Sequence, residues 1–368
     1  MGRSSRREGL LFLTSCLVWF GAAVHAQDTS DCFISRDLLE HAGLTLVWQT
    51  ALPIKKGEKL DTMQSLDERL YVRSDRNYTW SLDRNIGKVV FSRAIASAGF
   101  PIIGWEAYAD RLICVVDNRI VELDINTGRE KQVTDLELSI AAPPARNSQF
   151  FYVSASDRRL HAFRAKDMVQ LFQVAAENDS LVTTVLADEQ IVVFGTDAGN
   201  LIAVAADGPK KLWEFKAVEA IAGPIVRDGN SFLFADKDMS VYKVDMVGSF
   251  RVDLGWKFHA EGVLDRPPLV TTDIVYQYAP SRGLTAIHKQ SGQTVWSLRE
   301  GVDLLAEAAG KAYVTTNQKT LTVMDNATGR RLYWVNFAPV VNHATNLVDA
   351  KIYVADALGH IACLAPAR

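Results

Sequence analysis

The sequence has few cysteines and none of the short motifs that commonly mark an enzyme. Only 4 of its 368 residues are cysteines, no two of them adjacent or spaced as Cys-x-x-Cys, and its 7 histidines stand apart from one another. Neither His-Glu-x-x-His nor Gly-x-Ser-x-Gly occurs. Zinc sites and hydrolase nucleophiles commonly carry such spacings. We therefore expect no metal site, no cofactor site and no catalytic residue.

Blocks of one charge and helical periodicity are also scarce. The 40 Lys and Arg residues are scattered among 43 Asp and Glu residues, and the formal net charge is −3. Binding to nucleic acid or to an anionic membrane surface usually depends on a basic block, so we expect neither partner. The one short helix predicted spans residues 35–41, with Ser35 as its N-cap and Gly43 as its stop signal.

The N-terminus has the three parts of an export signal. Three arginines fall within the first seven residues, an apolar run follows at 10–24, and small residues precede position 27. This pattern predicts an exported protein whose signal is cleaved after residue 26. A lipoprotein reading remains open, because residues 13–16 end at Cys16 in the letters of a lipid-attachment box.

The mature chain then keeps Cys32, Cys114 and Cys363. An odd number of cysteines at wide spacing is not a disulfide framework. Cys114 and Cys363 lie in apolar strand patterns typical of buried thiols. A bridge between Cys32 and Cys363 that ties the two ends of the chain remains an alternative.

One unit of about forty residues recurs along the chain. Each unit contains an apolar strand, a polar turn and a second strand ending in an apolar anchor, often followed by Asp and then by a Thr-Gly turn. The anchors recur at intervals of 37 to 43 residues, at Leu82, Leu123, Phe163, Val204, Val244, Ile287, Met324 and Leu364. The strands alternate apolar and polar residues and are rich in Val, Ile, Tyr and Phe. A four-stranded repeat of this length is typical of a propeller blade.

The ends of the chain indicate how the ring closes. The last unit stops after its third strand, whereas residues 44–50 match the outer strand at 294–298. Pairing the N-terminal strand with the last unit would remove an exposed edge. The sequence therefore predicts an all-β fold: a single eight-bladed β-propeller of four-stranded antiparallel blades over residues 44–368, preceded by an N-terminal segment at 27–43.

Three sets of residues have predicted structural places. Prolines at 101, 143, 224 and 267 are expected on or before the innermost strands, since proline cannot donate a hydrogen bond to a central ladder. Large outer-strand side chains are expected to dock each blade on its neighbour, at Trp48, Trp213, Trp256, Trp296 and Trp334. Aspartates after the anchors are expected to cap their own turns, at Asp83, Asp124, Asp245 and Asp325. Trp105 is expected either in the channel or in the core, and His343 could meet His360 in the last blade.

The units resemble the pyrroloquinoline-quinone-type (PQQ-like) propeller repeats, in which aliphatic-Asp, two variable residues and Thr-Gly precede a Trp on the outer strand. Residues 124–128 and 325–329 match this pattern well, and 83–87 and 291–296 match it in part. Within these repeats, an exported eight-bladed domain of this size is most similar to the BamB family, the propeller subunit of the machine that assembles outer-membrane β-barrels.

That resemblance implies a non-catalytic envelope scaffold whose partners are envelope or outer-membrane proteins. The protein would then lie in the periplasm or at the periphery of the outer membrane, and membrane association would come through a partner or through a lipid on Cys16. Two alternatives remain at this stage. The first is a quinone-dependent dehydrogenase, although the adjacent cysteines and large insertions of such enzymes are missing. The second is a surface module that binds polysaccharide.

Overall fold

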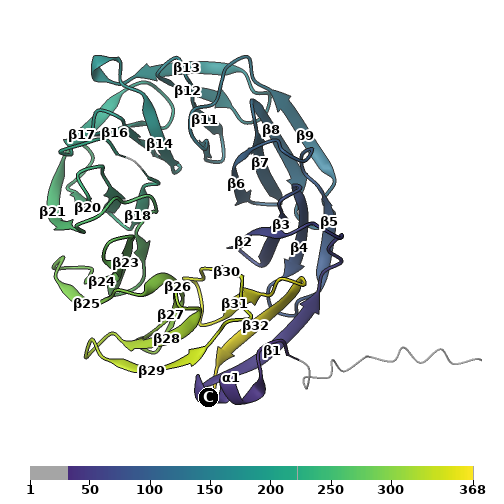
Figure 1. Ribbon diagram of the computed structural model, residues 1–368. Coiled ribbons are helices and arrows are strands. Elements are labelled where there is room, and N and C mark those ends of the chain that lie inside the picture. The colour runs from purple at the N-terminus through teal and green to yellow at the C-terminus, as the bar shows by residue number, and fades with distance from the viewer. Residues whose placement is uncertain (1–31, 222, 368) are drawn as a thin grey trace, which may run out of the picture.

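The computed structural model describes residues 32–221 and 223–367, and the described residues form a closed ring of eight β-sheets around a central channel (Figure 1). Each sheet has four antiparallel strands, numbered here from the channel outward. The prediction of an all-β, eight-bladed propeller is confirmed. The predicted export signal at 1–26 and Cys16 lie outside the described residues.

The strands of the eight blades follow one another along the chain. Blades one and two comprise β2 (Leu60–Leu66), β3 (Arg69–Ser74), β4 (Tyr78–Asp83), β5 (Val89–Ala94), β6 (Ile102–Tyr108), β7 (Arg111–Val116), β8 (Arg119–Asp124) and β9 (Glu130–Asp135). Blades three and four comprise β10 (Ala145–Arg146), β11 (Phe150–Ser154), β12 (Arg159–Arg164), β13 (Gln170–Ala175), β14 (Val182–Ala187), β15 (Ile191–Thr196), β16 (Asn200–Ala205) and β17 (Lys211–Lys216), with a short 3-10 turn at Glu177–Asp179.

The second half of the ring repeats this order. Blades five and six comprise β18 (Val226–Asp228), β19 (Ser231–Ala235), β20 (Ser240–Met246), β21 (Val252–His259), β22 (Leu269–Val270), β23 (Ile274–Ala279), β24 (Gly283–His288) and β25 (Thr294–Leu298). Blade seven comprises β26 (Gly301–Ala308), β27 (Lys311–Thr316), β28 (Thr320–Asp325) and β29 (Arg331–Asn336). Blade eight comprises β30 (Asn342–Ala344), β31 (Ile352–Ala355), β32 (His360–Pro366) and β1 (Leu44–Ala51).

The ring closes through the N-terminal strand, as the sequence predicts. β1 pairs antiparallel with β32, from Leu44 opposite Pro366 to Ala51 opposite His360. In Figure 1 the purple β1 lies beside the yellow β32. The closing strand therefore satisfies the edge that the C-terminal blade would otherwise expose.

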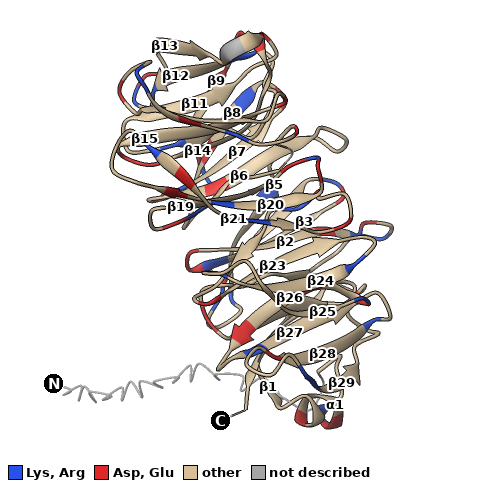
Figure 2. Ribbon diagram, turned by 90° about the vertical axis from the view of Figure 1, so that its left-hand side faces the viewer, with Lys and Arg blue, Asp and Glu red and all other residues tan. Residues whose placement is uncertain are grey.

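The hydrophobic core is divided among the seams between adjacent blades. In the described part of the chain, eight clusters of buried side chains each fill one seam. All eight anchors predicted from the repeat are buried in these clusters. Figure 2, which views the ring edge-on, shows acidic and basic residues scattered over the blades without a block of one sign. No helix within residues 32–221 and 223–367 has the length and apolar character needed to cross a membrane.

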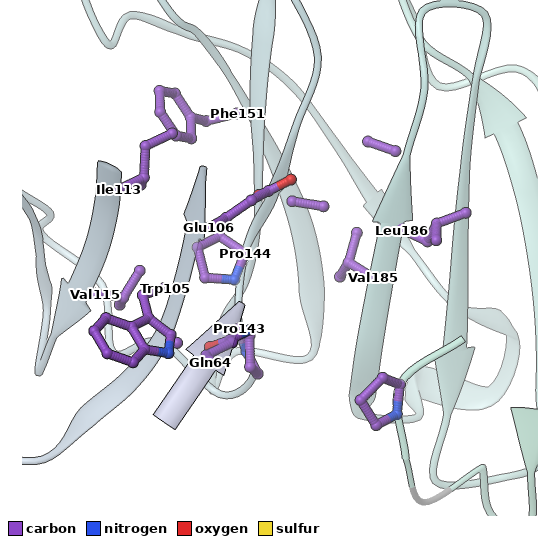
Figure 3. Close-up of a pocket in the computed structure, with 14 residues that line it drawn as sticks. Gln64, Trp105, Glu106, Ile113, Val115, Pro143, Pro144, Phe151, Val185 and Leu186 are labelled. Atoms are coloured by element: carbon purple, nitrogen blue, oxygen red, sulfur yellow. The ribbon is translucent and has the colours of Figure 1, made fainter. Parts of the chain in front are cut away.

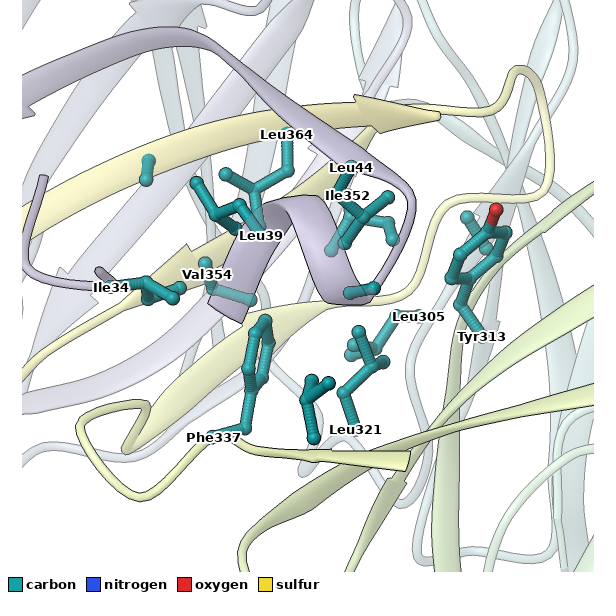
Figure 4. Close-up of a cluster of buried hydrophobic side chains, with 14 of the residues drawn as sticks. Ile34, Leu39, Leu44, Leu305, Tyr313, Leu321, Phe337, Ile352, Val354 and Leu364 are labelled. Carbon is teal, nitrogen blue, oxygen red and sulfur yellow. The ribbon is translucent and has the colours of Figure 1, made fainter. Parts of the chain in front are cut away.

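The predicted helix forms as α1 (Arg36–His41). The Ser35 hydroxyl accepts a hydrogen bond from the amide of Leu38, and Gly43 follows with a φ of +60°. Figure 4 shows the helix lying over the seam between blades seven and eight, where Leu39 packs among Phe337, Val354 and Leu364. The helix thus covers the end of the seam at which the ring closes.

Candidate functional site

Three of the outer-strand tryptophans each join their blade to the next one. The indole N–H of Trp48 donates a hydrogen bond of 3.1 Å to the carbonyl of Arg84, and that of Trp256 donates one of 2.8 Å to the carbonyl of Lys289. Trp296 donates in the same way to Oδ1 of Asn326 at 2.8 Å. In all three pairs the acceptor lies in the third turn of the following blade, so each of these tryptophans holds its blade to the next one.

A glycine of the third turn lies directly beneath the aromatic ring of the preceding blade. Gly87 has a φ of +70°, and a Cβ at this position would overlap Trp48. Gly128 lies in the same way against Phe91, and Gly292 against Trp256. The Thr-Gly element and the outer-strand aromatic residue are therefore the two halves of one joint between blades.

Three of the four predicted aspartates cap the third turns. The Oδ1 atom of Asp83 accepts hydrogen bonds from the amides at 85 and 86, and Asp124 and Asp325 accept from the equivalent amides of their own turns. Lys131 and Thr127 also donate to Asp124 and lower the pKa of its carboxyl group to about 2. The hydrogen bonds of these three carboxylates therefore stabilise their own turns.

The fourth aspartate, Asp245, does not cap a turn, and the prediction for it is wrong. It lies inside β20, where its Oδ1 atom accepts hydrogen bonds from Ser231 Oγ and Lys243 Nζ at 2.5 Å each. The cause is a longer connection in blade five, in which β20 continues to Met246 and the turn lacks the Thr-Gly element. The preceding tryptophan, Trp213, is buried, but its indole nitrogen has no hydrogen-bond partner.

Trp334 is not buried against a neighbouring blade, which corrects the prediction. Its side chain is 60% exposed because Tyr333 occupies the outer-strand position that faces the next seam. A shift of one residue along a strand turns a side chain to the opposite face. The Tyr333 hydroxyl donates a 2.8 Å hydrogen bond to the carbonyl of Ala42, at the end of α1.

The remaining cysteines and histidines are not brought together. Cys32, Cys114 and Cys363 are free, so the possible bridge between Cys32 and Cys363 is not formed. His343 pairs with Asp303 at 3.0 Å, whereas His360 pairs with Asp356 at 2.6 Å. No group of three His, Cys, Asp or Glu side chains in the described ranges is arranged to hold a metal ion.

A hollow opens on the channel between blades two and four, and it contains Trp105. The hollow has a volume of about 420 Å³, and Figure 3 shows Trp105 and Glu106 projecting from β6 on one side and Val185 and Leu186 from β14 on the other. Trp105 thus lines the channel, which the sequence left undecided. Glu106 was not singled out from the sequence, because an isolated glutamate in a strand pattern carries no signal of its own.

A patch of exposed apolar side chains lies on the outer corner of blade five. It comprises Val247, Phe250 and Leu254, which are 48%, 63% and 51% exposed. The amide of Val247 donates to the carbonyl of Arg251 and closes the turn that carries Phe250. Lys210 of blade four lies 5.2 Å from the centre of the Phe250 ring. We call these four residues the blade-five patch. The sequence signal for this patch was the long turn of blade five, the same turn that prevents Asp245 from acting as a cap.

Comparisons with known proteins point to one family. The family described as "Outer membrane protein assembly factor BamB" matches residues 101–297, which is more than half of the chain. BamB from Moraxella catarrhalis has a similar structure, with a TM-score of 0.63 and 15% identity over 88% of this chain and 97% of that one. The computationally designed Ika8 protein is also similar, with a TM-score of 0.65 and 14% identity over 86% and 98% of the two chains.

These structural likenesses, at such low identities, show the fold alone. No curated protein sequence matches the chain. The family assignment rests on the match over 101–297, which spans the repeats of blades two to six. It agrees with the aspartate turns and the glycine–aromatic joints described above. The chain therefore belongs to the family of the outer-membrane protein assembly factor BamB.

Proposed function

We propose that this chain is a non-catalytic scaffold of the cell envelope and that it binds an outer-membrane assembly protein through the blade-five patch. The observation that carries the proposal is the concentration of Val247, Phe250 and Leu254 within one hairpin, with Lys210 beside them. Clustered apolar side chains that stay exposed on a folded domain commonly mark a protein interface. Aromatic side chains, Phe among them, are enriched at the buried centres of protein interfaces.

The ring provides the rigid support that such an interface needs. Buried clusters fill the two seams on either side of blade five, so the hairpin is carried by a fixed sheet. A rigid binding loop loses little conformational entropy when a partner docks. In this proposal the chain is exported through residues 1–26, and it is held at the membrane by its partner or by a lipid on Cys16.

The proposal is tested with a photo-crosslinking amino acid in the full chain, expressed in the native host. The crosslinker replaces Phe250 in one strain. In a control strain it replaces Val133, an isolated apolar residue that is also exposed but lies on β9 of blade two. We expect mass spectrometry to identify an outer-membrane or envelope protein joined to position 250 and absent from position 133.

The enzymatic alternative is measured on the same purified chain. Its absorbance is followed with pyrroloquinoline quinone, Ca²⁺, an artificial electron acceptor and a panel of sugars and alcohols. Substrate-dependent reduction of the acceptor, together with equal crosslinks at 250 and 133, would reject the scaffold role.

A further inference from the structure

The hollow between blades two and four lies where the inner strand of blade three is short. β10 is only two residues long, whereas the neighbouring inner strands β6 and β14 have seven and six residues. Pro143 and Pro144 directly precede β10, and proline has no amide hydrogen with which to extend a ladder. The channel wall therefore recedes at blade three, and the hollow of about 420 Å³ occupies that place.

The walls of the hollow are apolar except at one carboxylate. Trp105, Phe151, Leu186 and the prolines of two blades are among the residues that line it, and Glu106 is the one charged residue of the lining. Figure 3 shows the Glu106 side chain extending from β6 into the space that faces Val185 and Leu186. A single charge on an apolar wall favours a ligand with one opposite charge on an apolar stem.

The Glu106 side chain is exposed to the channel. Among the residues that the structure describes, no side chain forms an ion pair or a hydrogen bond with it. The apolar walls of the hollow partly desolvate the carboxylate and raise its pKa, and the positive charge of Arg146 opposes that shift only in part. The carboxylate is therefore accessible to a cationic ligand.

Arg146 acts on Glu106 only through its charge, and its guanidinium is held by other groups. Its guanidinium lies 4.1 Å from the centre of the Tyr108 ring and 4.5 Å from that of Phe151. It is also 3.8 Å from the buried carboxylate of Glu122. These contacts hold the guanidinium, and no ion pair between Arg146 and Glu106 is formed among the described residues.

We propose that this hollow binds a lysine or arginine side chain of an extended protein segment, with Glu106 as its counter-ion. The strands on both sides favour a peptide over a small amine. β6 and β14 are each the innermost strand of their sheet, and neither has a strand partner on the channel side. An extended peptide pairs readily with such an edge while its side chains fill the adjacent pocket. This site is separate from the blade-five patch and rests on the proposed function only in that its ligand is a protein.

Fluorescence anisotropy with two labelled peptides tests the inference on the folded chain. One probe is acetyl-Ser-Thr-Val-Lys-Val-Thr-Ser-amide, and the other has norleucine in place of lysine, which keeps the apolar stem without the charge. We expect the lysine peptide to bind at least tenfold more tightly than the norleucine peptide. E106Q is expected to remove this difference. Glu137 is an exposed glutamate on the loop after β9, and the control variant E137Q is expected to preserve the difference.

A second variant tests the position of the site. Ala145→Trp places a large side chain in the hollow, and it is expected to weaken the binding of both peptides while the variant keeps the thermal midpoint of the parent chain. Equal affinity of the two peptides, an unchanged preference in E106Q, or displacement of the lysine peptide by an equal concentration of n-butylammonium would overturn the inference. The crosslink at position 250 is measured separately, so the failure of either proposal can be distinguished.

Discussion

At the scale of single residues, the ring depends on a repeated fit between a glycine and an aromatic ring. Gly87, Gly128 and Gly292 each have a positive φ and no room for a Cβ beneath the aromatic residue of the preceding blade. Met168 holds the equivalent turn position in blade three with a φ of +55°. The outer strand of blade two carries Gln132 instead of an aromatic side chain at the facing position. Glycine is thus required by the overlying ring and not by the backbone alone.

Replacing Gly87 with alanine should destabilise the fold more than the same change at Gly310. The two glycines have φ values of +70° and +72°, but space around Gly310 is open whereas Trp48 overlies Gly87. We expect Gly310→Ala to lower the free energy of unfolding by about 1 kcal/mol through backbone strain. Gly87→Ala should lose about 2–4 kcal/mol because overpacking adds to that strain. Urea unfolding measures both, and equal losses would show that the joint has no steric role.

The buried thiols predict a loss of stability in alkali. Burial raises the pKa of both Cys114 and Cys363 to about 12, from an ordinary value of 9.0. Their contribution is complete below pH 9 and is lost as the pH rises towards 12, because the unfolded chain releases these protons first. The urea midpoint should therefore fall between pH 9 and pH 11.

A cysteine variant separates this effect from other alkaline changes. Cys114→Ala should be less stable at pH 8, because the change leaves a cavity, but its midpoint should fall less steeply with pH. Burial also raises the pKa of Tyr71 to about 12, so part of the slope should persist in the variant. A slope identical to that of the parent chain would contradict the assignment to the thiol.

At the scale of elements, α1 takes the place of the third turn that blade eight cannot have. The third and fourth strands of this blade, β32 and β1, lie at opposite ends of the chain, so no covalent turn joins them. Instead Ala42 and Gly43, at the end of α1, lie beneath Tyr333 of blade seven. The carbonyl of Ala42 accepts from Tyr333 as the carbonyl of Arg84 accepts from Trp48. The helix end thus reproduces the joint found between the other blades.

Tyr333→Phe removes the hydrogen bond of that substitute joint. The bond is partly buried, and its loss should lower the free energy of unfolding by about 1 kcal/mol. Tyr78→Phe serves as the matched control, since its hydroxyl bonds only to Ser92 at the exposed surface. We expect a change below about 0.5 kcal/mol for the control. Calorimetry measures the stability of both variants. A larger loss of stability in Tyr78→Phe than in Tyr333→Phe would contradict the proposed joint.

Periodic features of the sequence predicted the strands and blades. Features that do not recur in each repeat were not predicted from the sequence. The anchors from Leu82 to Leu364 have buried positions in every blade, so their regular spacing was sufficient to define the fold. Trp334 was misplaced because two adjacent aromatic residues offered two registers, and only the pairing of Tyr333 with Val323 resolves them. The hollow at Glu106 was not predicted, since it depends on the convergence of several inner strands and not on any one segment.

At the scale of the whole molecule, the ring is held closed by one noncovalent strand pair. The amide of Ala367 donates to the carbonyl of Gly43, so the two ends of the described chain lie next to each other. Leu44 is opposite Pro366 in the same ladder. A short turn could therefore join these two strands covalently without changing any blade.

Moving the closing strand to the other end of the chain should preserve the fold. One variant lacks residues 1–51, and a second also lacks them but carries 44–51 after residue 367 through an Asp-Asn-Thr-Gly turn. We expect the first to unfold at a clearly lower urea concentration, because the seam around Trp48 is opened. The second should recover to within about 1 kcal/mol of the parent chain. Closure by β1 would be unnecessary if the first variant matched the parent.

The pairing of β1 with β32 also fixes when the molecule can be finished. Thr45 and Ala365 are hydrogen-bonded across 320 residues, so β1, which is synthesised before the other described strands, pairs with the last of them, β32. Contacts so distant along the chain form slowly, because a large loop has to close before any bond is gained. A nascent chain interrupted before residue 360 would leave β1 without its partner strand, and such incomplete products should be readily cleaved by proteases.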